Sequence, residues 1–155
     1  MSHARQVIRE AIATILNTMP TLWTRAHETR VPSPRQVWPY LMVFAVNDAS
    51  LKQTIHPTSI YDREVTINVI GMLRLPGSGD TQTIEDKMDA VASGVETKLT
   101  HAAMQAIVPN VLTFYLESTA LDVVVTEEDA VDHAEITMVY RASYAINEGA
   151  PDTLI

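Results

Sequence analysis

Apolar residues recur at helical spacing in two stretches of the chain. Between residues 4 and 19 they lie at Val7, Ile8, Ala11, Ile12, Ile15, Leu16 and Met19. This spacing places them on one stripe of an α-helix, which we expect Pro20 to end. A second helix is predicted from residue 84 to about residue 104, where the apolar residues are Ile84, Met88, Val91, Val95 and Leu99.

Gly94 lies inside the second predicted helix. Glycine in a helix interior costs about 1 kcal/mol relative to alanine. We therefore expect a neighbouring element to pack closely against the helix at this position.

Other stretches carry the patterns of β-strands. Residues 61–75 alternate most clearly, because Val65, Ile67 and Val69 share one face and polar residues share the other. Further strands are predicted over residues 22–30, 40–46, 111–118, 121–126 and 134–146. Residues 40–46 are apolar on both faces, as in a central strand covered on each side. Residues 47–50 have turn composition, and the polar segment to residue 58 predicts an extended arm or a weak edge strand.

The order of these elements predicts one α+β domain over residues 1–155, with a loosely held C-terminal tail at 147–155. Turns join the long strands, so we expect a largely antiparallel or mixed sheet of five to six strands. The two helices should pack on one face of this sheet. The other face is then open, and oligomerisation would be a natural way to complete the fold.

Composition narrows the classes of partner. The chain has 11 basic and 19 acidic residues, a net charge of −8. This balance argues against a protein that grips a phosphate backbone over a broad surface, although DNA could slide past it. No apolar run is long enough to cross a bilayer, and charges within the opening residues argue against a signal peptide. The absence of cysteine excludes disulfides and thiolate chemistry.

No motif supports catalysis, a cofactor or a metal site. The five histidines are scattered and lack ligand spacing. Residues 77–80 read Gly-Ser-Gly-Asp before a helix, but they lack the lysine of a phosphate loop. The acidic group at residues 127–133 lacks the ligand order of a calcium loop and is predicted to be a solvated turn. We expect no enzymatic activity, no cofactor and no metal.

Local sequences along nearly the whole chain carry a resemblance to a known family. They are the amphipathic opening helix, Trp38-Pro39-Tyr40-Leu41, Tyr61-Asp62-Arg63-Glu64-Val65, Ile84-Glu85-Asp86, and the closing pattern from Val139-Tyr140-Arg141 through Tyr144 to Gly149-Ala150-Pro151. In these features the chain resembles the tail-terminator, or tail-completion, proteins of long-tailed bacteriophages. The likeness is one of length, element order and texture, and no single motif in it is specific.

The resemblance implies a self-assembled ring, typically a hexamer, that caps the tail tube, ends its polymerisation and offers a surface to the head. The implied partners are further copies of the chain, the tail tube protein and a head–tail connector protein. DNA would pass through without specific binding, and no membrane is involved. The implied location is the head-proximal end of the virion tail, and the host cytoplasm during assembly.

Five residues are candidates for the subunit or tube interface. They are two arginines on an otherwise acidic and apolar strand and three aromatic residues on or beside strands: Trp38, Tyr61, Arg63, Arg74 and Tyr115. We expect the arginines to form ion pairs between subunits, or else to pair locally with Glu64 or Asp62 or simply to be hydrated. Under the first hypothesis, Arg63→Glu should weaken ring formation.

Two other classes remain open from the residues alone. A different neck or connector ring protein would share the ring and the acidic charge, but would bind the portal side. An unrelated small cytosolic ligand-binding module or enzyme would be monomeric or dimeric, with a defined apolar pocket.

Overall fold

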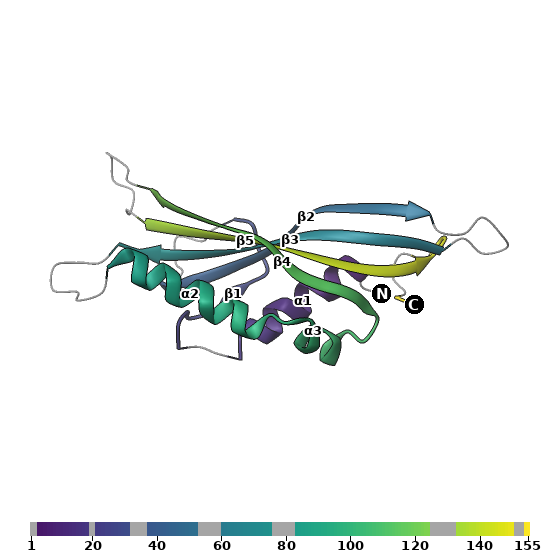
Figure 1. Ribbon diagram of the computed structural model, residues 1–155, viewed down its shortest axis with the longest axis horizontal. Helices are drawn as coiled ribbons and strands as arrows, with labels where there is room; N and C mark the ends of the chain where they lie inside the picture. Colours follow the sequence, from purple (N-terminus) through teal and green to yellow (C-terminus); the bar gives the residue numbers. More distant parts are fainter. Residues whose placement is uncertain are drawn as a thin grey trace.

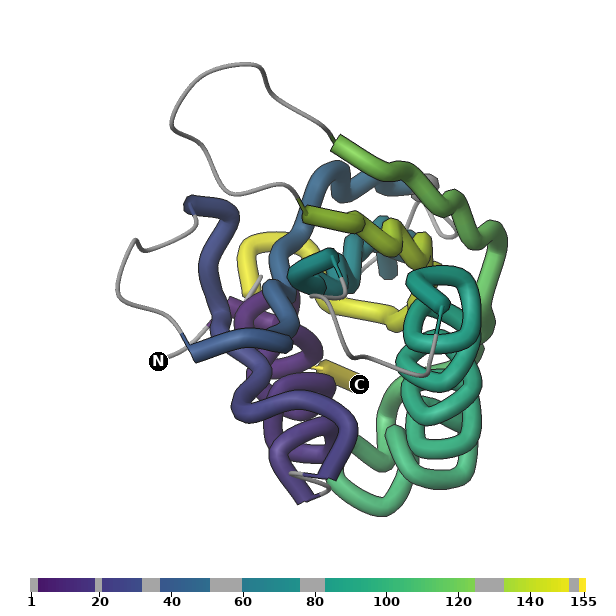
Figure 2. Tube along the Cα trace, turned by 90° about the vertical axis from the view of Figure 1, so that its left-hand side faces the viewer, coloured from purple at the N-terminus to yellow at the C-terminus, as the bar shows by residue number. Residues whose placement is uncertain are grey.

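The computed structural model describes residues 3–18, 21–31, 37–52, 60–75, 83–124, 133–150 and 154–155. These residues form a five-stranded sheet with helices on one face, which Figure 1 shows from the side and Figure 2 along the sheet. The predicted α+β class is confirmed.

The sheet has the strand order β1-β2-β3-β5-β4. Its strands are β1 (Ala26–His27), β2 (Tyr40–Lys52), β3 (Ile60–Arg74), β4 (Val111–Val124) and β5 (His133–Asn147). The two-residue β1 runs parallel to β2, and every other neighbouring pair is antiparallel. The sheet is therefore mixed, with an antiparallel body.

Three helices pack on the sheet, where the sequence predicted two. They are α1 (Ala4–Leu16), α2 (Ile84–Lys98) and α3 (His101–Ile107). The predicted second helix is divided at Thr100, whose backbone is extended. The Thr100 side chain caps the start of α3 by accepting a hydrogen bond from the Ala103 N–H. A capping hydroxyl of this kind satisfies a backbone donor that a new helix would otherwise leave unpaired.

The first helix ends at Leu16, three residues earlier than predicted. Trp23 is buried, and its Nε1–H donates to the Leu16 carbonyl at 2.9 Å. Asn17 donates to the Ala26 carbonyl and accepts from the Ala26 N–H. These side-chain bonds stop the helix and hold β1 beside it, so only two residues of the predicted 22–30 strand join the sheet.

Two strand boundaries differ from the prediction. Residues 47–50 continue β2 past a β-bulge between Ala45 and Asn47 instead of turning. The predicted strands 111–118 and 121–126 are one strand, β4, which has irregularities after Val111 and after Leu116. A bulge lets a strand absorb an extra residue and continue. Residues 53–59, 77–80 and 127–132 lie outside the described part of the chain.

The core lies between the sheet and the helices. As predicted, Val65, Ile67 and Val69 of β3 are buried there, beside the alternating apolar residues of β5, which are Ile136, Met138, Tyr140, Ala142, Tyr144 and Ile146. At Gly94 of α2 an added Cβ would lie 2.5 Å from Leu22 and 3.1 Å from Trp23. The expected close contact is therefore present, and it is made by the segment between α1 and β1.

The described end of the C-terminal tail contacts the sheet. Leu154 forms a bridge with Ile146, and the Ile155 N–H donates to the Ala145 carbonyl at 3.1 Å. Asn110 donates from its side chain to the Leu154 carbonyl. The tail predicted to be loosely held thus returns to β5 at residue 154.

Candidate assembly surfaces

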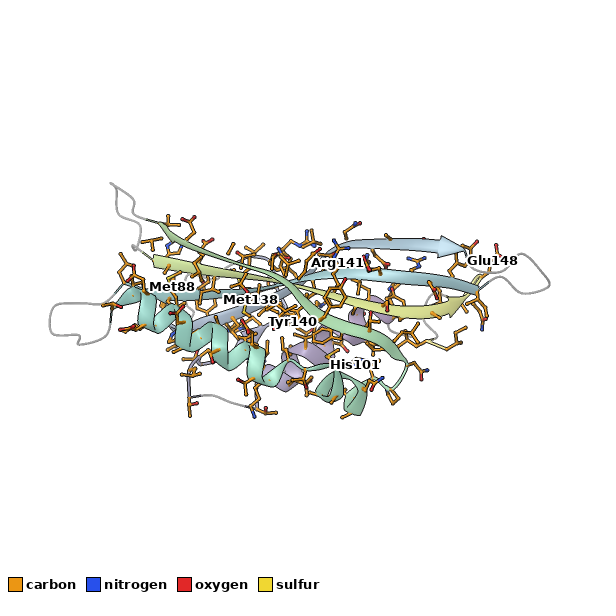
Figure 3. The ribbon with its side chains drawn as sticks, viewed as in Figure 1. Met88, His101, Met138, Tyr140, Arg141 and Glu148 are labelled. Carbon is orange, nitrogen blue, oxygen red and sulfur yellow. The ribbon has the colours of Figure 1, made fainter. Side chains whose placement is uncertain are left out.

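The sheet face opposite the helices carries most of the polar residues of the long strands. Figure 3 shows Tyr140 on the helix side of β5 and its neighbour Arg141 on the opposite side. Tyr140 is buried, and burial, followed by the charge of Glu96, raises the pKa of its hydroxyl. The strand alternation thus separates an apolar face from a polar one that no described element covers.

Arg141 lies between two carboxylates on this open face. Its Nη1 contacts Glu64 of β3, and its Nε lies 2.9 Å from Glu117 Oε1 of β4. The hydrogen bonds that the guanidinium donates to Glu117, and then to Glu64, raise its pKa. The three side chains tie three strands together and leave one carboxylate charge in excess.

A second polar cluster is buried at the helix side of the sheet. Asp48 Oδ2 accepts from Arg63 Nη1 at 3.2 Å and from the Tyr144 hydroxyl at 3.1 Å. The Asp48 side chain is 6% exposed and that of Arg63 26%. Burial, and after it the negative charge of Asp48, raise the pKa of the Tyr144 hydroxyl. Two buried atoms of this cluster, Asp48 Oδ1 and Arg63 Nε, have no hydrogen-bond partner among the described residues.

One corner of the open face is apolar and aromatic. Tyr40, Met42 and Met72 are buried there, with Trp38, Phe44 and Ile70 packed against them. The Arg74 guanidinium lies 5.6 Å from the Trp38 ring centroid, and the His133 ring lies 6.0 Å from it. This apolar corner therefore occupies the part of the open face beside β2, where the polar residues of β3 do not extend.

The strand β4 forms one edge of the sheet. Exposed apolar side chains and acidic ones alternate along it, on both faces of the sheet. We call Tyr115, Glu117, Leu121, Asp122 and Val123 the β4 edge surface; Tyr115 is 48% and Leu121 52% exposed. A long edge strand that exposes apolar residues favours association with another chain.

The opposite edge is formed by β2, which β1 covers only at Leu41 and Met42. Beside its bulge is a hollow of about 340 Å³. We call it the basic pocket; its lining includes Arg5, Arg9, Glu28, Arg30, Phe44 and Asn47.

Three arginines in the basic pocket face a single glutamate. Arg9 Nε lies 3.4 Å from Glu28 Oε2. Arg30 donates to the Ala45 carbonyl at 2.7 Å and lies over the Phe44 ring. Arg5 forms no ion pair within the described residues. The pocket therefore carries net positive charge on an acidic protein.

The structure brings together only two of the five predicted interface residues, Trp38 and Arg74. Arg63 forms an ion pair with Asp48. The local alternative had predicted Glu64 or Asp62 as its partner. The Tyr61 hydroxyl donates to Glu148 at 3.4 Å at the far end of β3. Tyr115 lies alone of the five on β4. No observation here tests their predicted role between subunits.

Sequence reasoning missed the basic pocket and the Arg141 cluster. The pocket combines α1, the segment after β1 and the bulge of β2, which are far apart in the sequence. The cluster had one usable signal, because Glu64 and Arg141 both lie at polar positions of clearly alternating strands.

The described residues contain no group of three or more side chains able to hold a metal ion. Among the helices of the same residues, none is long and apolar enough to span a membrane.

No family model matches the chain, and no curated protein matches it either. Among solved structures, it is similar to a chain from the virion of a native gene transfer agent particle. The two superpose with a TM-score of 0.52 at 16% identity, over 92% of this chain and 98% of that one. The two chains share a fold. At this identity the likeness establishes the fold alone.

Proposed function

We propose that this chain is a structural protein of a phage-like virion, and within that class a tail terminator. Copies of it would form a ring, most simply a hexamer, that caps the tail tube, ends its polymerisation and offers a surface to a head–tail connector protein. DNA would pass through the ring unbound. The ring would lie at the head-proximal end of the tail.

The observation that carries this proposal is the incomplete sheet. Within the described residues, helices cover one face, and no strand pairs with the outer side of β4 or of most of β2, which leaves two different unpaired edges on opposite sides of the same sheet. Two unlike surfaces on opposite sides of a subunit suit head-to-tail contacts, and such contacts generate rings when the rotation between copies closes. A virion chain of nearly the same extent and fold supports the same class of function.

The absence of any assembled reactive constellation in the described residues is consistent with a non-enzymatic role, which stays a prediction. The largest ion-paired groups, around Arg141 and Asp48, join strands within the subunit.

The test has two parts. Electron microscopy and native mass spectrometry across a concentration series should reveal a closed ring. Added during polymerisation of purified tail tube protein, the chain should shorten the tubes and appear at one end of each. A ring that binds connector protein but leaves tube length unchanged would instead indicate a neck ring. A monomer at every concentration that ignores tubes would contradict both.

A further inference from the structure

We propose that the β4 edge surface of one copy docks into the basic pocket at the β2 edge of the next copy. The inference rests on the proposed ring function and specifies which surfaces meet in it. The partner is a second copy of this chain, because the two surfaces complement each other in charge and in position.

Charge complementarity is the first argument. The basic pocket holds Arg5, Arg9 and Arg30 against Glu28 alone. On the other side of the sheet, Glu117 of the β4 edge surface belongs to the carboxylate excess around Arg141, and Asp122 lies farther along β4, opposite Glu135. Copies of a protein whose net charge is −8 repel one another unless positive charge is concentrated at the contact between them. Complementary patches steer association and fix its register.

Position across the sheet is the second argument. The strand register aligns Asn47 at the β2 edge with Tyr115 at the β4 edge. The row between them runs through Thr66 of β3 and Arg141 of β5. The next row on the same face of the sheet joins Phe44, Asn68, Val139 and Ser118. The basic pocket and the Tyr115–Ser118 end of the β4 edge surface thus lie at the same height along the strands.

This equal height bears on the kind of assembly that the contact would give. A copy placed beside the first needs no shift along the strands to bring Glu117 to the pocket. Head-to-tail contacts without such a rise can close into a ring, whereas a rise along the axis gives an open helical filament.

Side chains, more than backbone pairing, would form the contact. Both edges are irregular where they would meet, at Ala45–Asn47 in β2 and at Leu116–Ser118 in β4. Bulges at sheet edges interrupt continuous strand pairing between molecules. Exposed Val46 beside the pocket and exposed Tyr115 on β4 provide apolar area next to the charges.

The test is charge reversal in the full chain, followed by analytical ultracentrifugation across a concentration series. We expect Arg30→Glu and Glu117→Lys each to raise the dissociation constant of self-association at least about tenfold. The double variant should return to within about threefold of wild type, because the swapped charges attract again. Wild-type association should also weaken as salt rises from about 0.05 M to about 0.5 M.

Matched controls are Lys98→Glu and Asp89→Lys on α2, neither of which belongs to the basic pocket or to the β4 edge surface; they should leave the dissociation constant unchanged. Circular dichroism and urea denaturation check that each variant folds. If Glu117→Lys disturbs the Arg141 cluster, Tyr115→Lys tests the aligned part of the same surface without removing a carboxylate of that cluster. Wild-type rings that none of the edge reversals weakens would overturn this inference and leave the ring function standing. Wild-type protein that forms no ring, alone or on tubes, would overturn the ring function itself.

Discussion

Arg63 illustrates how the structure changes the meaning of a single residue. From the sequence it is a candidate for an ion pair between subunits, but its guanidinium contacts Asp48, whose side chain is 6% exposed. Asp48 also accepts from Tyr144, which is fully buried. Loss of assembly in an Arg63→Glu variant would therefore first reflect a damaged fold.

We expect Arg63→Glu to lower the free energy of unfolding by about 3 kcal/mol or more, because it leaves a buried carboxylate facing a second one. Urea denaturation measures this change. Arg74→Glu is the matched control in the same strand, exposed and held only over Trp38. It should lose less than about 1 kcal/mol. Equal losses in the two variants would contradict the structural role of Arg63.

His27 provides a pH-dependent readout of its surroundings. Burial, and then the charge of Arg25, lower the pKa of its imidazole below the ordinary value of 6.5. The ring also packs edge-on against Tyr40, with centroids 6.1 Å apart. Because the unfolded chain takes up this proton first, the free energy of unfolding should fall as pH drops from 6.5 through the lower native pKa.

Two measurements check the His27 prediction. The ring should titrate by nuclear magnetic resonance with a midpoint below 6.5, and His27→Asn should flatten the decline in stability in that pH range. A midpoint at or above 6.5 would mean that the ring is solvated and not confined between β1 and β2.

At the scale of elements, the sequence was most informative where one face of a strand or helix is buried. The alternation of β3 and β5 predicted the buried residues of both strands, because the core demands one apolar side. In β4, by contrast, Glu117 to Ala120 are exposed on an edge strand, so no burial pattern distinguishes them from a turn.

The continuation of β2 was missed for a different reason. Residues 47–50 have the composition of a turn, yet Asp48 lies in the strand with partners 15 and 96 residues away in the chain. Local sequence cannot report such contacts. The basic pocket escaped prediction on the same grounds, because its arginines belong to elements that only the fold brings together.

The boundary between α2 and α3 yields a prediction about a cap. Thr100 Oγ1 accepts from the Ala103 N–H at 3.1 Å, so Thr100→Ala should lower the free energy of unfolding by about 1 kcal/mol. Thr97→Ala is the control, because this hydroxyl bonds within α2 and alanine favours a helix interior. Urea denaturation should find Thr97→Ala unchanged or slightly stabilised. A loss in Thr97→Ala as large as that in Thr100→Ala would contradict the capping role.

For the whole molecule, the net charge of −8 predicts weak contact with nucleic acid. At about 0.15 M salt we expect affinity for duplex DNA weaker than a dissociation constant of about 10⁻⁴ M, because the chain offers few cations to phosphates. Fluorescence anisotropy measures this binding for both subunit and ring. Tight binding by the subunit that disappears on ring formation would locate the basic pocket as the DNA contact and confirm that assembly covers it.

The placement of the three described helices on one side of the sheet has a consequence for any ring closed through the sheet edges. Its wall would be helical on one side and stranded on the other, and the stranded side would present carboxylates such as Glu64 and Glu135. With that side turned inward, a passing duplex would be repelled from the wall within a Debye length of about 10 Å. The negative charge of the channel wall would then keep DNA near the centre of the channel, where it could move without binding to the wall.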